Sequence, residues 1–188
     1  MLLQNLNIKT GDVYLGSGTA KSSYLTRWIT KSVFSHSGLL WKNGNNILTY
    51  ETYKPNFCEP ADYLTGLRGK GTQSVLFQDR LNSYTGNIWL LRLKSEFESY
   101  RLILENLILT GKYQRRFCSS WFKLAAAGFK WPIAFNAGRT FFCSELVLTV
   151  YRDAGILPKS VEPWRYTPVD LVRHFGYLFE DAVLIKVK

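Results

Sequence analysis

A short turn between two strand-like segments is the feature of this sequence that most constrains its fold. Asn43-Gly44-Asn45-Asn46 combines residues that tolerate the backbone angles of a tight hairpin turn. The run from Phe34 to Trp41 precedes this turn and the segment ILTYETY at 47–53 follows it, and both are rich in apolar residues. The sequence therefore predicts an antiparallel hairpin early in the chain.

The remaining elements indicate a mixed fold. Because neither a repeat nor a shift in composition divides the sequence, we expect one α+β domain over residues 1–188, a length that can bury a substantial core. Apolar spacing predicts helices over 22–33, 95–110, 141–154 and 168–174, and strands over 13–15, 75–78, 87–93 and 182–187.

The net charge of +10, from 24 Lys and Arg against 14 Asp and Glu, favours anionic partners. Nucleic acid, anionic lipid and an anionic cell-wall polymer all qualify. The basic residues are scattered, however, and their densest cluster is only Lys112, Arg115 and Arg116. We therefore expect a solvated basic surface that suits an anionic partner and no specific nucleic-acid site. The oligomeric state is not indicated.

The N-terminal segment MLLQNLNIKTGD has neither a basic start nor a long apolar stretch, so it does not resemble a signal peptide. No apolar run approaches the roughly eighteen residues of a membrane span. We expect a cytoplasmic or virion-associated protein that would reach the outside of a cell by a route such as lysis.

Three cysteines are candidate nucleophiles. Their odd number excludes a fully paired disulfide framework, so we expect free thiols. Because the sequence has only two histidines, a Cys/His zinc site would need nearly every available ligand. We therefore expect no metal and no cofactor. Cys143 ranks first because it begins a predicted helix, whose N-terminal dipole stabilises a thiolate. Cys118 follows, beside two arginines, and Cys58 lies in an irregular stretch. The alternative for each is a small buried apolar residue.

Histidine is the usual general base near neutral pH. His36 lies on the first hairpin strand between the small residues Ser35 and Ser37, which leave its ring approachable, whereas His174 lies in a short amphipathic helix that favours a solvated or capping role. Glu51 lies on the returning strand, where its carboxylate can orient the His36 ring, although a surface position explains it equally well.

Two other carboxylates near these elements have structural explanations. Asp12 follows a glycine in a turn, where a capping role is sufficient. Glu145 lies in the first turn of the helix that Cys143 begins, where its charge suits the helix dipole and could also select a cationic substrate group.

The order of these pieces resembles the circularly permuted NlpC/P60 hydrolases of the papain-like superfamily, in the YiiX/YebB-like branch that includes poxvirus members. The matching motifs are Gly11-Asp12 before a strand, Ser35-His36-Ser37-Gly38, Phe142-Cys143-Ser144-Glu145-Leu146, and Tyr166-Thr167-Pro168-Val169-Asp170-Leu171. The resemblance covers about 11–53 and 139–187. The middle, about 55–138, is unmatched and insertion-like.

The resemblance implies a permuted papain-like fold, with a small antiparallel sheet or barrel packed against helices and the cysteine at a helix N-terminus. It also implies a cysteine peptidase or amidase in which Cys143 is the nucleophile, His36 the base and Glu51 the orienting acid. Glu51 is carried over by its strand position alone.

The resemblance leaves the substrate open between two classes. We expect cleavage of an amide, in a peptidoglycan peptide or an isopeptide, through an acyl-enzyme. A lipid acyltransferase or thioesterase of the same superfamily is the alternative, and the aromatic side chains between Trp121 and Phe135 could line an acyl groove or pack in the core. A non-catalytic basic binding module is a third interpretation.

Overall fold

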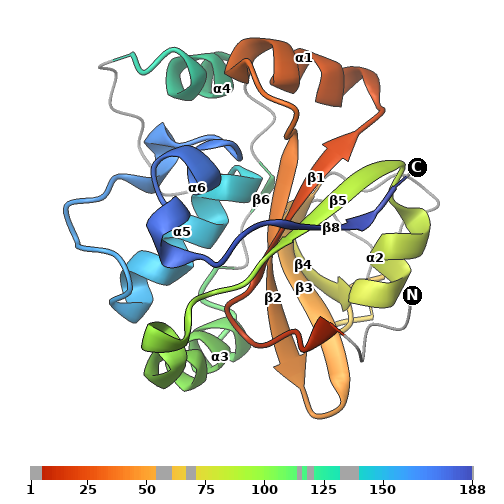
Figure 1. The fold of residues 1–188 in the computed structure, drawn as a ribbon, viewed down its shortest axis with the longest axis vertical. Coiled ribbons are helices and arrows are strands. Elements are labelled where there is room, and N and C mark those ends of the chain that lie inside the picture. Colours follow the sequence, from red (N-terminus) through yellow and green to blue (C-terminus); the bar gives the residue numbers. More distant parts are fainter. Residues whose placement is uncertain are drawn as a thin grey trace.

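The structure is a computed structural model that describes residues 6–53, 61–66, 71–113, 116–117, 121–131 and 140–187. Within these residues, six strands form one antiparallel sheet in the order β4-β3-β2-β1-β5-β8 (Figure 1). The strands are β1 (Val13–Gly18), β2 (His36–Asn43), β3 (Asn46–Tyr53), β4 (Gly71–Leu76), β5 (Gly86–Leu91) and β8 (Val183–Lys186). A short parallel pair, β6 (Arg116–Phe117) and β7 (Thr140–Phe141), forms a separate two-stranded sheet beside β3 and β4.

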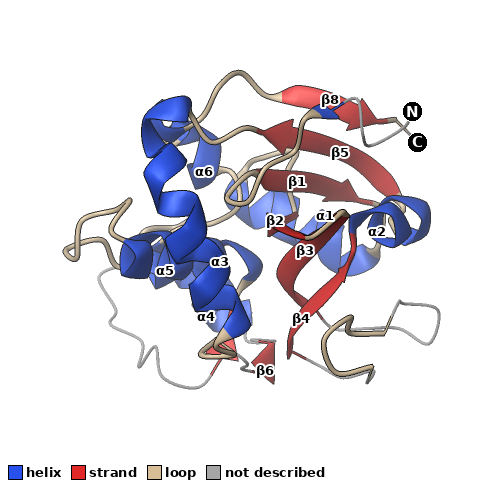
Figure 2. Cartoon of the chain, turned by 90° about the horizontal axis from the view of Figure 1, so that it is seen from below, coloured by secondary structure: helices blue, strands red, loops and turns tan. Residues whose placement is uncertain are grey.

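Helices separate the strands in the sequence and gather beside the sheet in space. Figure 2 shows α3, α4, α5 and α6 on one side and the curved strands on the other. The α-helices are α1 (Lys21–Thr30), α2 (Phe77–Ser83), α3 (Arg101–Leu109), α4 (Trp121–Gly128), α5 (Cys143–Ala154) and α6 (Asp170–Arg173). The 3₁₀ helices are η2 (Ser95–Tyr100), η3 (Pro163–Arg165) and η4 (Gly176–Leu178).

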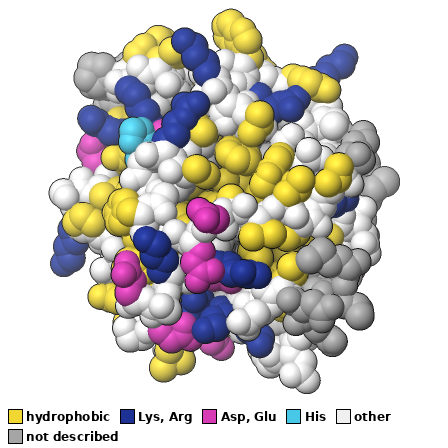
Figure 3. Space-filling model, viewed as in Figure 1, with side chains coloured by type: hydrophobic (Ala, Val, Ile, Leu, Met, Phe, Trp, Pro, Cys, Tyr) yellow, Lys and Arg dark blue, Asp and Glu magenta, His cyan; other side chains and the backbone are white. Residues whose placement is uncertain are grey.

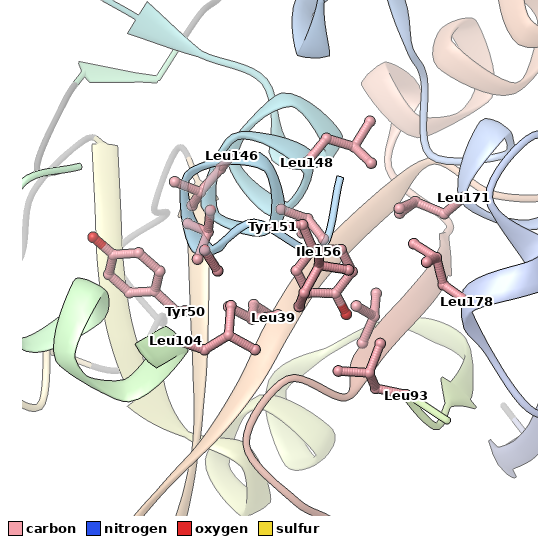
Figure 4. Packing of buried hydrophobic residues seen from close by; sticks show 14 of the residues in the cluster. Leu39, Tyr50, Leu93, Leu104, Leu146, Leu148, Tyr151, Ile156, Leu171 and Leu178 are labelled. Atoms are coloured by element: carbon pink, nitrogen blue, oxygen red, sulfur yellow. The ribbon is translucent and has the colours of Figure 1, made fainter. Parts of the chain in front are cut away.

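The helix α5 forms the centre of the main core. Apart from Arg152 and Asp153, every residue of α5 is buried, as expected of a helix enclosed on all sides. Figure 4 shows Leu146 and Tyr151 of α5 in one cluster with Leu39 of β2. This packing fixes the position of the α5 N-terminus relative to the sheet.

The other face of the sheet is also covered. Because side chains alternate along a strand, Val13 and Leu15 join the α5 core while Tyr14 joins a second cluster with Leu40 and with Phe77 of α2. Polar groups on this second face are therefore removed from solvent.

The predicted hairpin is confirmed, with Lys42 paired to Ile47 and Gly44 at a φ of 59°. The mixed α+β class is also confirmed. The predicted helix over 95–110 is divided into η2 and α3, and α2 was not predicted, because this short helix has too few apolar residues to show a helical period. Among the described residues, no helix is long and apolar enough to cross a membrane.

Candidate active site

The imidazole of His36 packs against two tyrosine rings. His36 is the first residue of β2 and pairs with Gly16 of β1. The ring centroid of Tyr14 lies 5.7 Å from that of His36 in a tilted arrangement, and the Tyr84 ring stacks with the imidazole at a centroid distance of 6.4 Å. Gly16 makes room for this arrangement, since a Cβ there would lie 2.4 Å from the Tyr84 hydroxyl. The ring of His36 is thus held in place by packing.

Glu51 is fully buried and its two carboxylate oxygens are both engaged. Oε2 lies 2.7 Å from Nε2 of His36 and accepts a hydrogen bond from the Tyr14 hydroxyl. Oε1 accepts hydrogen bonds from Nε of Arg80 at 2.8 Å and from Oγ1 of Thr49 at 3.1 Å. A buried carboxylate persists as an anion when it is paired and hydrogen-bonded in this way.

Gly38 provides the space that this network needs. It lies opposite Tyr14 in the β1–β2 register, and a Cβ at Gly38 would lie 2.4 Å from Cε1 of Tyr14 and 3.2 Å from Cβ of Glu51. A larger residue would therefore displace Tyr14 from the carboxylate of Glu51.

Cys143 is the first residue of α5 and is nearly buried, with 8% of its surface exposed. The imidazole of His36 and the residue Ser37 lie close enough to its thiol to act on the ionisation of the sulfur. Because Nε2 of His36 faces Glu51, the Nδ1 side of the ring is left for the sulfur. The three residues that the sequence analysis selected, Cys143, His36 and Glu51, are therefore brought together in this order.

The charges of these groups shift their pKa values in the sense that a thiolate–imidazolium pair requires. Burial raises the pKa of the Cys143 thiol, but the hydrogen bond and charge of His36 and the hydrogen bonds of Ser37 outweigh it, so the pKa is lowered overall. Burial lowers the pKa of His36, but Cys143 and Glu51 outweigh it and raise the pKa to about 9.

The pKa of Glu51 moves in the opposite direction. Burial raises it, but the charge of Arg80, followed by the interactions with His36 and Tyr14, lowers it to about 2. Glu51 therefore remains charged near neutral pH and can hold the protonated ring of His36.

A second buried ion pair supports the start of α5. Glu145 accepts a hydrogen bond from the backbone N–H of Phe142 at 3.1 Å, and Nζ of Lys123 lies 3.0 and 2.8 Å from its two carboxylate oxygens. Glu145 thus caps the N-terminus of α5, and its position in the first turn agrees with the helix-dipole role expected for it. Because Lys123 occupies the carboxylate, Glu145 does not offer a free charge to a cationic substrate group.

The other sequence candidates lie elsewhere. The side chain of His174 is 52% exposed and lies 3.1 Å from the Asp170 carboxylate, in agreement with the predicted solvated role. Asp12 accepts hydrogen bonds from the backbone N–H groups of Lys9 and Leu93, as expected of a capping residue. Cys58 and Cys118 lie outside the described residues.

Sequence reasoning missed Tyr14, Arg80 and Tyr84. Tyr14 lies between the apolar residues Val13 and Leu15 in β1, and its hydroxyl was a signal for a buried hydrogen-bonding role. Arg80 gave no such signal, because it belongs to the unpredicted α2 and reaches Glu51 only through the tertiary fold. Among the described residues, no group of three or more His, Cys, Asp or Glu side chains is arranged to hold a metal ion.

Comparison with known proteins identifies a similar fold. No protein-family model matches the sequence, and no curated protein matches it. Among solved structures, the metalloprotein YiiX from Escherichia coli O157:H7 has a similar fold, with a TM-score of 0.55 and 15% sequence identity over 94% of this chain and 88% of YiiX. At this identity the similarity concerns the fold alone: an α+β fold of the YiiX type, in which an antiparallel sheet packs against helices.

Proposed function

We propose that this protein is a cysteine hydrolase of the permuted NlpC/P60 type that cleaves an amide bond through a covalent acyl-enzyme. The observation that carries the proposal is the buried chain from Cys143 through His36 to Glu51. A thiol at a helix N-terminus, an imidazole beside it and a carboxylate behind the imidazole form the set that activates a nucleophile. The fold similarity to YiiX and the motif order in the sequence support the same proposal.

In this mechanism the thiolate of Cys143 attacks the carbonyl carbon of the substrate and the carbonyl oxygen becomes an oxyanion. The backbone N–H of Cys143, at the start of α5, is suited to donate to that oxyanion. When the C–N bond breaks, the imidazolium of His36 gives its proton to the amine that leaves. Water then attacks the thioester while His36 accepts a proton, and the acid departs as the thiolate is regenerated.

Substrates with an amide in a peptidoglycan peptide or an isopeptide remain the preferred class. A lipid ester or amide is the second candidate, and the exposed aromatic side chains of Trp28 and Phe129 favour it. Both classes use the same acyl-enzyme, so they differ in the group that occupies the acyl site rather than in the roles of Cys143 and His36.

The test is to trap the acyl-enzyme with electrophilic acyl probes that carry either a peptide or a fatty-acyl group, and to measure the intact mass. We expect one adduct on Cys143, which the Cys143→Ala variant loses and the Cys118→Ala variant retains. The preferred probe identifies the substrate class. Full hydrolytic activity in Cys143→Ala would exclude the mechanism, and equal, slow labelling of all three cysteines would favour a non-catalytic binding module.

A further inference from the structure

The helix α1 directs most of its large apolar side chains into solvent. The sequence predicts a helix here from the apolar spacing of Tyr24, Leu25, Trp28 and Ile29, yet only Ile29 of these four is buried. The exposed fractions of Tyr24, Leu25 and Trp28 are 57%, 40% and 73%. Exposed apolar side chains gathered on one helix face are characteristic of an interaction surface.

The end of α4 extends this surface. Phe129 and Trp131 are 48% and 41% exposed, and their rings stack at a centroid distance of 5.9 Å. Core packing is therefore not the role of these two aromatic residues. A depression between α1 and α4 is lined by Arg27, Trp28, Lys31, Ser32 and Phe129. We call the surface formed by Tyr24, Leu25, Trp28, Phe129 and Trp131, with Lys21, Arg27 and Lys31 around them, the α1–α4 face.

The positive charge of the chain is concentrated in two long segments, one of which includes α1 and the other α4. Residues 13–50 and 106–144 contain no Asp or Glu, and they contain four and six basic residues. The rest of the chain has fourteen residues of each sign, so these two segments account for the whole net charge of +10. Figure 3 shows hydrophobic and basic side chains together along the upper edge of the molecule, over α1 and α4.

Several of these cations are on the face itself. Lys21 at the start of α1 and Lys31 directly after its end are exposed, and the guanidinium of Arg27 lies 4.5 Å from the centre of the Tyr24 ring. Lys130 contributes less, because its Nζ is paired with the Asp170 carboxylate at 2.8 Å.

The α1–α4 face is connected to the candidate active site through the core. Ile29 of α1, Leu124 of α4 and Phe142 form one buried cluster, and Phe142 directly precedes Cys143. The two helices that carry the face are therefore packed against the N-terminus of α5 on their buried sides.

We propose that the α1–α4 face docks the protein onto the surface of an anionic lipid bilayer. Trp and Tyr prefer the interfacial region of a membrane, Leu and Phe insert among the acyl chains, and Lys and Arg bind anionic headgroups. The face combines all three kinds of residue and lies on segments without opposing charge. The proposal is independent of acyl transfer, since docking requires no reaction at Cys143.

Two other partners fit the face less well. Nucleic acid would use the cations and the aromatic rings, but the exposed aliphatic side chains of Leu25 and Val33 offer no surface for base stacking. A second copy of the chain would bring two surfaces of the same positive charge together, which costs free energy.

The experiment is co-sedimentation of the whole protein with vesicles of phosphatidylcholine alone, or of phosphatidylcholine with roughly one third phosphatidylserine. We expect binding to the mixed vesicles that weakens as salt is added, because salt screens the headgroup charge. Lys21→Glu combined with Lys31→Glu should weaken binding at least about tenfold. The matched pair Lys42→Glu and Lys159→Glu makes the same change in net charge at exposed sites away from the face, and should retain clearly tighter binding.

The apolar contribution is tested by Trp28→Ser, against Leu102→Ser at a residue that is 67% exposed on α3. We expect Trp28→Ser to weaken vesicle binding about tenfold and Leu102→Ser to leave it within about twofold. The proposal would be overturned if the two lysine double variants lost the same amount of vesicle binding, or if Trp28→Ser and Leu102→Ser did. Equal binding of the wild type to neutral and anionic vesicles would also overturn it. The proposal would likewise be overturned if the protein did not bind vesicles but bound DNA, or self-associated in sedimentation velocity, in a way that depends on Trp28.

Discussion

Arg80 donates a hydrogen bond from Nε to Oε1 of Glu51 at 2.8 Å, and both side chains are completely buried. Because the other oxygen of Glu51 faces His36, the arginine is coupled to the imidazole through one carboxylate. Replacement of Arg80 by Met should cost about 3 kcal/mol of folding free energy, since it removes one partner of a buried pair. Chemical denaturation measures this cost. Arg165→Met, at an exposed pair with Glu162, is the control and should cost less than about 1 kcal/mol.

The Arg80→Met effect should depend on pH. Glu51 has a folded pKa of about 2, below its ordinary value of 4.5, so its ionisation stabilises the fold above about pH 4.5 and that contribution is lost as the pH falls towards 2. Removal of Arg80 raises the pKa of Glu51. The difference in stability between the wild type and Arg80→Met should therefore narrow on acidification, and a constant difference from pH 5 to pH 2 would contradict this account.

The pH dependence of catalysis should report on the thiolate–imidazolium pair. The lowered pKa of Cys143 and the pKa of about 9 for His36 predict a bell-shaped profile of kcat/KM with its alkaline limb near pH 9. Glu51→Gln removes a charge that raises the pKa of His36, so the alkaline limb should move to lower pH. Glu98→Gln, at an exposed carboxylate, should leave the limb in place.

Gly38→Ala should disturb the candidate site without a change in any charged group. The added Cβ would lie 2.4 Å from Cε1 of Tyr14, so Tyr14 must move and its hydrogen bond to Glu51 weakens. We expect a loss of stability of about 1–3 kcal/mol from overpacking and slower labelling of Cys143. Gly176→Ala is the control, because nothing lies within 4 Å of a Cβ there. If Gly38→Ala and Gly176→Ala had the same thermal stability and the same rate of Cys143 labelling, the position of Tyr14 would not depend on the absence of a side chain at Gly38.

Lys123→Met should destabilise the protein because it removes a cation that lies against the buried carboxylate of Glu145. We expect a cost of about 3 kcal/mol, measured by denaturation, which the double variant Lys123→Met with Glu145→Gln should partly recover. The exposed lysine of the pair Lys112–Asp153 is the matched control, and its replacement by Met should cost less than about 1 kcal/mol. An equal cost at both lysines would contradict a special role for the buried pair.

Local sequence signals determined the hairpin and the helix that begins at Cys143. A turn rich in Asn and Gly and the apolar spacing of a helix with an acidic residue in its first turn act within a few residues, so their effect can be predicted without knowledge of the fold. The hairpin was also sufficient to place Glu51 on the strand beside His36, because side chains on one face of adjacent strands are neighbours.

The tertiary structure alone decided which groups complete this arrangement. The thiol of Cys143 meets His36 because α5 is enclosed in the core and packs against the sheet, and Arg80 reaches Glu51 from a helix that has no clear periodicity. The same is true of α1, where Ile29 is buried but Tyr24, Leu25 and Trp28 remain exposed. Apolar spacing determines that side chains share a face, but only the packing of distant segments determines whether that face is covered.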